Sequence, residues 1–488
     1  MHKLNRDNYI FIAALAAIMV ILSVSNSNLL LNIMFLVCIF LGFCTVKPKD
    51  NYERFYYTLI ISAFFEYTVY FLRYEKLYLF HILLVLLTIN YLYLLFKKKY
   101  TLQKIDKKIL SFYIIWYLYI VVSIIWSKNT SYAIKYIIIY TIMFLFLFIL
   151  IQFNSSREKF YNTLKVMGFM FVIVICIGLL ESIIGIQLPV KHYYNYTVHQ
   201  LSLRELSLVS KRPIAFFYNS NNFATVVTIF LSFSMFFTFY CKRRMHKILA
   251  YIVTIIAFST IILTNSRTNF LSAVVVTIIF SILILLDDRK KSLIYIVLFL
   301  ISFTISYNYS YLLVSNRDVS NQPQISKRMN ELSNIYKNKV ELGEEGSVNE
   351  RMTIINDVYE GVIKEGRIFG FGAGNTPQYL MDRKNTAGIY SPHGLLIELL
   401  GDFGLPFLIL FICYTLYLLY STFKTSVTKS GISKSIGYSL MTSIIGYGIA
   451  SFAPSSVTYF LPNWIFIGLV ISYIQINKTI GKGKEYEF

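Results

Sequence analysis

The chain has 488 residues and a formal net charge of +21 at pH 7, yet only 15% of its residues are charged and 56% are hydrophobic. Soluble globular proteins carry about 25% charged residues, so this composition excludes an ordinary soluble domain. The positive charge could suit nucleic acid, but most Lys and Arg residues flank apolar runs of roughly 17–25 residues, the length that spans a bilayer. We therefore expect membrane lipid as a partner and not nucleic acid.

About fourteen such apolar runs follow one another along the chain. The sequence therefore predicts an all-α polytopic membrane protein, with one integral membrane domain over residues 1–488. The expected spans are 9–25, 28–46, 55–72, 77–96, 109–126, 133–152, 161–186, 222–240, 248–264, 268–286, 293–313, 395–420, 436–453 and 460–476.

The N-terminus and the cysteines both fit the interpretation of the chain as a series of membrane spans. The basic N-terminus leads into an apolar run without a small-residue cleavage site, which indicates a retained span and not a signal peptide. The five cysteines show no paired spacing in an exported loop, so we expect neither a disulfide framework nor a metal site. They are Cys38, Cys44, Cys176, Cys241 and Cys413.

Basic residues are concentrated in alternate loops, which predicts the orientation of the chain. Loops rich in Lys and Arg stay in the cytoplasm, so both termini should lie there, in agreement with an even number of spans. The basic loops contain Lys97–Lys99 with Lys104, Lys107 and Lys108; Lys242–Arg244 with Lys247; Arg289–Lys291; and Lys424, Lys429 and Lys434.

Two long loops face the opposite side, 187–221 and 314–394. The larger loop contains a capping box, Ser347-x-x-Glu350, followed by apolar residues at helical spacing. These signals predict an amphipathic helix over 348–364. Arg351 lies in its first turn, where free N–H groups and a guanidinium both favour an anion. The alternative is an ordinary exposed arginine.

Two further features lie later in the same loop. The glycine-rich turn at 369–375 lacks the spacing of a dinucleotide fingerprint, and it serves either a close approach to substrate or a simple structural turn. His393 precedes the next span, where a neutral imidazole suits a general base, although a structural histidine is the alternative. Asp402 and Gly404 follow a little over two helical turns further on.

Other polar residues lie at or within the spans. Arg212 and Arg267 face the outside against the positive-inside bias, which favours anion binding, with lipid headgroups as the alternative. Asn222 begins the span at 222–240. Three ionisable residues inside the predicted spans are functional candidates by default, although one structural hydrogen bond each explains them as well. They are Glu66, His81 and Glu181.

Taken in order, these motifs resemble the O-antigen ligase and Wzy-polymerase family of bacterial envelope enzymes. The resemblance covers about residues 205–410, whereas the first seven spans match only in being hydrophobic. Gly394 departs mildly from the family, which usually has Asn or Ser after the histidine. The motifs are Arg212-Pro with Asn219 and Asn222-Phe; Asn265-Ser-Arg267; Ser347 with Glu350-Arg351; Gly370-Phe-Gly-Ala-Gly-Asn375; and His393-Gly-Leu-Leu with Gly401-Asp402-Phe-Gly404.

The resemblance implies a GT-C-like membrane glycosyltransferase of the bacterial inner membrane that uses neither a metal nor another cofactor. Its donor would be an oligosaccharide on undecaprenyl diphosphate, and a flippase and a chain-length regulator are candidate partners. His393 would be the base and Arg351 would stabilise the diphosphate leaving group. The substrate-binding candidates are Arg212, Arg267, Asn222 and Asp402.

Independent features of the chain fit this chemistry. A diphosphate leaving group carries its own charge and needs cations, which arginines supply. Metal-using GT-C enzymes would want acidic residues on the first outward loop, but Ser25–Asn28 has none. The resemblance thus implies a polysaccharide polymerase acting on the outer face, which the Tyr-, Ile- and Lys-rich composition and the divergent N-terminal half favour over a ligase. A ligase that transfers the glycan to lipid A core is the nearest alternative. A lipid-linked glycan flippase is the alternative from another functional class, and it would need related halves and a charged central cavity.

Overall fold

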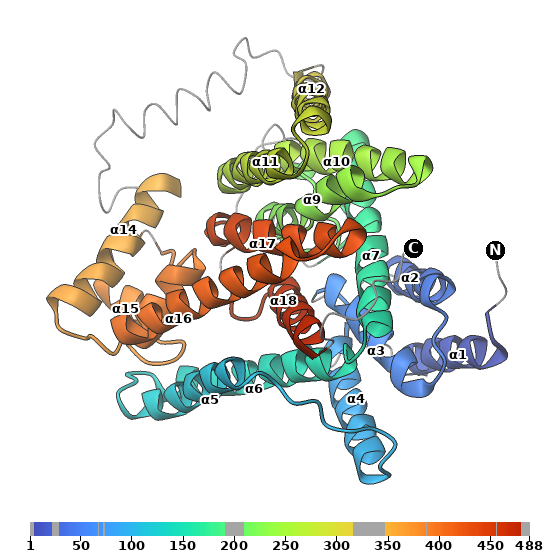
Figure 1. The fold of residues 1–488 in the computed structure, drawn as a ribbon. Coiled ribbons are helices and arrows are strands. Elements are labelled where there is room, and N and C mark those ends of the chain that lie inside the picture. Colours follow the sequence, from blue (N-terminus) through green and yellow to red (C-terminus); the bar gives the residue numbers. More distant parts are fainter. Residues whose placement is uncertain are drawn as a thin grey trace.

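The computed structural model describes residues 4–21, 29–66, 68–71, 74–190, 209–315, 347–386, 388–454 and 456–479. Within these ranges the chain is almost entirely helical, and the strands are one short antiparallel pair, β1 (Tyr70–Phe71) and β2 (Tyr74–Tyr78). Figure 1 shows the helices as one bundle with a smaller helical group beside it. The prediction of an all-α polytopic membrane protein is confirmed.

The helices before the large outer loop are α1 (Arg6–Ile21), α2 (Leu29–Val46), α3 (Asn51–Phe64), α4 (Leu79–Phe96), α5 (Lys107–Val122) with the short η1 (Ser123–Ile125), α6 (Thr130–Phe153), α7 (Arg157–Ile184), α9 (Ser220–Tyr240), α10 (Arg244–Leu263), α11 (Arg267–Asp287) and α12 (Arg289–Ser315). The later helices are α14 (Ser347–Tyr359), η2 (Glu360–Lys364), α15 (Thr376–Arg383), α16 (Leu395–Val427), α17 (Gly431–Ala450) and α18 (Leu461–Thr479).

Among the described residues, 10 helices are long and apolar enough to cross a membrane. They are α2, α4, α5 with η1, α6, α7, α9, α10, α11, α12 and α16. The other four predicted spans correspond to α1, α3, α17 and α18, which are shorter or less apolar, so the count of fourteen is not confirmed.

The predicted span 55–72 is wrong in its second half. Helix α3 ends at Phe64, Glu66 has a left-handed φ of +44°, and β1 begins at Tyr70. A run of apolar and aromatic residues fits either a strand or a helix, and its hydrophobicity alone does not distinguish them. The backbone at Glu66 ends the helix because a right-handed helix cannot continue through a positive φ.

Helix α9 lies at the centre of the bundle. In the most apolar 18-residue stretch of α9, 83% is buried inside the protein, whereas the corresponding share for the peripheral α12 is 22%. Helices α10, α11 and α17 pack around α9, and α16 packs against α17, α18 and α5. Figure 1 shows α14 and α15 beyond one end of α16. This group, built from the predicted outer loop, is therefore carried by the N-terminal end of α16.

The basic loops and the candidate site residues lie at opposite ends of the bundle. At one end, Lys434 in the first turn of α17 is 2.7 Å from the Asp287 carboxylate, to which Tyr240 also donates a hydrogen bond. At the other end, Thr225 near the start of α9 donates to the carbonyl of Ala450 at the end of α17 (3.4 Å). Helix α9 has 21 residues, a rise of about 31 Å between these ends.

This separation makes the predicted orientation testable by labelling. Starting from a cysteine-free variant, we expect Lys364→Cys to react with a membrane-impermeant maleimide in intact cells, because Lys364 lies on the outer helical group. The exposed Lys290, at the end that carries the basic loops, serves as the matched position. Lys290→Cys should react only after the cells are permeabilised, and the reverse pattern would contradict the orientation.

Candidate functional site

The glycine turn 369–375 is paired with a kink in α16. The amide of Phe371 donates to the Gly401 carbonyl (2.7 Å), and the Leu405 amide donates to the Ile368 carbonyl (2.9 Å). At the kink, Gly404 has φ +74°, and a Cβ there would overlap the Ile368 oxygen. The turn thus holds this end of α16, which favours the structural interpretation, and its approach to substrate stays a prediction.

Asp402 connects this turn to the membrane helix. Its carboxylate accepts hydrogen bonds from the Gly374 amide (2.8 Å), the Thr376 amide (3.1 Å) and the Thr376 hydroxyl (2.6 Å). The side chain is 1% exposed. These contacts give Asp402 the task of positioning the turn and the start of α15, and its predicted contact with substrate stays untested.

Glu398, one turn before Asp402, was not predicted as important. Its carboxylate accepts from the Ser456 hydroxyl (2.8 Å), the Val457 amide (3.0 Å) and the Thr458 hydroxyl (2.6 Å), so it holds the connection between α17 and α18. Two carboxylates four residues apart inside an apolar run lie on one face of a helix, and that spacing could have identified Glu398.

His393 lies just before the first residue of α16, in a left-handed backbone conformation with φ +42°. Such a φ is uncommon for a residue with a side chain and is a feature of strained functional sites. The next residue, Gly394, has φ +147°, and a ring carbon of Phe452 lies 2.8 Å from where its Cβ would be. This contact accounts for glycine in place of the usual Asn or Ser.

The imidazole of His393 has the protonation state that a general base requires. Burial, followed by the positive charge of Arg351, lowers its pKa to about 4. The Nδ1 atom is buried without a hydrogen-bond partner in the part of the chain that the structure describes. The ring is therefore neutral at pH 7 and has a nitrogen that no other described group uses.

Arg351 brings a second outer helix to this position. It lies in the first turn of α14, and burial followed by the charge of Arg267 lowers its pKa, while Glu350 acts in the opposite direction. Arg267 is the first residue of α11. Arg351 thus lies near a second guanidinium group, that of Arg267, and near the neutral imidazole of His393. The mutual repulsion of the two guanidinium groups favours an anion between them.

The other predicted residues lie at the same end of the bundle but outside this group. Asn222 donates to a Glu66 carboxylate oxygen (3.5 Å), and its own Oδ1 is buried without a partner among the described residues. Arg212 is positioned through its carbonyl, which accepts from the Gln187 side chain (2.7 Å). Its predicted contact with substrate stays a prediction.

The buried glutamates of the spans have structural partners. The Glu181 carboxylate accepts from the amides of Leu188, Ile214 and Ala215 at 2.7–2.8 Å and so holds the segment that follows Arg212. This arrangement favours the structural interpretation of Glu181. Throughout the described ranges, no group of three His, Cys, Asp or Glu side chains is placed to hold a metal ion.

The predicted helix of the large outer loop corresponds to α14 and η2, which together cover residues 347–364. Its first two side chains lie outside the described residues, and so does the Ser347 half of the capping box. Residues 316–346 are likewise outside them. Of the two features predicted in this loop before His393, the structure therefore describes both the helix and the glycine turn.

Comparison with known proteins shows what this chain is similar to. Residues 252–412 match the family described as O-Antigen ligase, a range that contains Arg267, Arg351, His393 and Asp402. The chain is also 23% identical over 393 residues to the teichuronic acid biosynthesis protein TuaE of Bacillus subtilis (strain 168). The alignment covers 76% of this chain and 72% of that protein. The resemblance to the O-antigen ligase and Wzy-polymerase family is confirmed.

Proposed function

We propose that this chain, whose residues 252–412 match the O-antigen ligase family, is a polysaccharide polymerase of the bacterial inner membrane. In this proposal both termini are cytoplasmic and the reaction takes place on the outer face. The observation that supports it is the position of Arg351 near both Arg267 and a neutral His393 whose Nδ1 has no described partner. The donor and the acceptor are both glycans on undecaprenyl diphosphate.

In the proposed reaction, a hydroxyl of the acceptor sugar attacks the anomeric carbon of the donor. His393 takes the proton of that hydroxyl, and the bond from the anomeric carbon to the diphosphate oxygen breaks. Undecaprenyl diphosphate leaves with the electron pair, and Arg351 and Arg267 stabilise the charge that develops on it. The guanidinium groups stabilise the charge of the leaving group as a metal ion would in a metal-using enzyme, so no metal or other cofactor is part of the proposal.

The relative in Bacillus subtilis supports a surface polysaccharide as product, because its name assigns it to teichuronic acid biosynthesis. A ligase would share the donor chemistry and differ in its acceptor, lipid A core. A flippase needs charged groups along a central path, whereas the proposed groups gather at one end of the bundle. A flippase that delivers the repeats and a chain-length regulator are the partners that a polymerase would need.

The decisive experiment compares surface polysaccharide from cells with and without this chain. Deletion is expected to reduce the polymer ladder on a gel to single repeats, and the intact chain should restore it. Polymerisation in isolated membranes should continue in EDTA, since the leaving group is held by arginines. If cells without this chain still make full-length polymer, and that polymer stays on undecaprenyl diphosphate, the chain is instead a ligase. Activity that EDTA abolishes and Mg²⁺ or Mn²⁺ restores would contradict the arginine-based mechanism.

A further inference from the structure

A cleft of about 430 Å³ opens between the end of α5 and the glycine turn. Trp126 and Lys128 form one side of it, and residues 366–371 with Asn375, Tyr379 and Asp382 form the other. Helix α16 contacts α5 on this side and α17 on the other, and it runs between them in Figure 1. The glycine turn that lines the cleft pairs with residues 401–405 of α16, whereas His393 precedes its first turn, so the two also lie at least about 12 Å apart along the helix.

Aromatic rings dominate the lining of this cleft. The side chain of Phe369 is 60% exposed and that of Trp126 is 38% exposed, and their ring centroids are 6.5 Å apart at an interplanar angle of 53°. Behind them, Phe371 and Tyr379 stack at 4.0 Å. Two exposed ring faces beside polar groups suit a ligand with one apolar face and a hydroxylated edge, which is the chemistry of a sugar ring.

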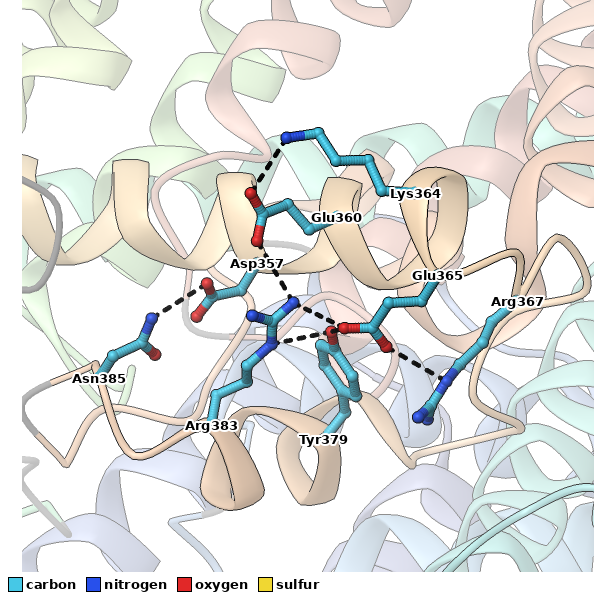
Figure 2. A network of polar contacts seen from close by, with 8 residues as sticks. All are labelled: Asp357, Glu360, Lys364, Glu365, Arg367, Tyr379, Arg383 and Asn385. Carbon is cyan, nitrogen blue, oxygen red and sulfur yellow. Dashed lines mark hydrogen bonds and ion pairs between the residues drawn. The ribbon is translucent and has the colours of Figure 1, made fainter.

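The wall of the cleft is held rigid by the polar network in Figure 2. The Tyr379 hydroxyl donates to Glu365 (2.9 Å) and accepts from the Arg383 Nε (2.9 Å). The Arg367 guanidinium lies 5.2 Å from the Tyr379 ring centroid and 3.5 Å from the second Glu365 oxygen. The part of the wall formed by Tyr379 and the Phe371 ring stacked on it is therefore fixed before any ligand binds, which lowers the entropy cost of binding.

The charges at the cleft are largely paired. Lys128 forms an ion pair with Asp382 (2.6 Å), and Arg367 forms one with Glu365 (3.5 Å). Each of these two cations is thus matched by a carboxylate. The cleft thus favours a hydroxyl-rich ligand with little charge over a phosphate or an anionic lipid headgroup.

We propose that this cleft binds sugar units of the glycan at a distance from the bond being made. The proposal rests on the proposed function and adds a second glycan contact to it. A chain held both at His393 and at the cleft dissociates more slowly between additions, because release of one contact leaves the other bound. The cleft would therefore favour long products.

Trp126 provides a direct binding signal. The other two tryptophans, Trp116 and Trp464, are 3% and 1% exposed, so a soluble ligand at the cleft should change the fluorescence of Trp126 alone. The probe is an oligosaccharide released by mild acid from the surface polymer of the producing strain, added to the full chain in lipid nanodiscs. A saturable change is expected, and Phe369→Ala should weaken binding about three- to tenfold.

The matched control is Tyr359→Ala, since Tyr359 is a 48% exposed aromatic on the same outer loop outside the cleft. It should bind like the unaltered chain, and His393→Ala should also bind normally. In cells, Phe369→Ala and Trp126→Ala should each shorten the polymer while transfer of single repeats continues. If the oligosaccharide binds but the chain has no polymerase activity, the cleft is still a sugar-binding site and the proposed function is wrong.

Two results would overturn the inference. One is the absence of saturable oligosaccharide binding, or binding that Phe369→Ala leaves unchanged. The other is quenching of Trp126 by brominated lipid without a response to oligosaccharide, which would assign the cleft to the membrane interface. Normal polymer length in Phe369→Ala and Trp126→Ala at normal protein level would likewise remove its role in chain growth.

Discussion

Replacing His393 by alanine is expected to slow polymerisation by about 10²–10⁴-fold, the usual cost of losing a general base. Donor binding should stay nearly intact, because the neutral imidazole carries no charge that holds the diphosphate. The measurement is the rate of single-turnover transfer in membranes with matched protein levels. The ladder on a gel should also collapse toward single repeats.

The pH dependence gives this prediction a second readout. In the free enzyme the pKa of His393 is lowered to about 4, so the base is neutral above that pH and is lost as the pH falls through it. The acid limb of kcat/KM should therefore lie well below the ordinary histidine value. Bound diphosphate brings negative charge beside the cations, raises the pKa and makes the imidazole a stronger base. The acid limb of kcat should thus lie at a higher pH than the acid limb of kcat/KM.

His246 offers a matched control for the histidine replacement. It is exposed near the start of α10, at the end of the bundle that carries the basic loops. We expect His246→Ala to make polymer of normal length. Normal polymer from His393→Ala at a normal protein level would remove this histidine from the mechanism.

The elements that could be predicted from sequence are those set by local patterns. An apolar run of spanning length predicted 77–96, and α4 covers Leu79–Phe96. Helical spacing predicted 348–364, and α14 with η2 covers that segment. The run at 55–72 failed because a strand and a helix share its composition. Its ending depends on the backbone of Glu66, which residue type alone does not reveal.

The candidate residues were named from motifs, but their tasks depend on contacts between distant segments. Asp402 bonds to Thr376, 26 residues away, and nothing local indicates that this carboxylate is already engaged. Glu398 bonds to Ser456, 58 residues away. Arg267, like His393, reaches Arg351 only through the packing of different helices. Such tertiary pairings decide whether a polar residue holds the fold or faces a ligand.

Replacing Arg351 by alanine is expected to weaken donor binding and also to slow transfer by about 10²–10³-fold. The leaving diphosphate gains charge in the transition state, so a lost cation costs more there than in the ground state. The loss also removes the charge that depresses the His393 pKa. The acid limb of kcat/KM should therefore move upward, although only partly, because burial is the larger cause.

Arg351→Lys separates charge from shape at the same position. Lysine restores the positive charge but not the planar fork that grips two phosphate oxygens, so rescue should be partial. Arg244→Ala, an exposed arginine at the opposite end of the bundle, is the matched control and should leave polymer length unchanged. If Arg351→Ala kept donor affinity and the acid limb of the unaltered chain, Arg351 would not be the diphosphate ligand. Arg267 would then be the cation to test next, since it is the neighbour whose charge acts on Arg351.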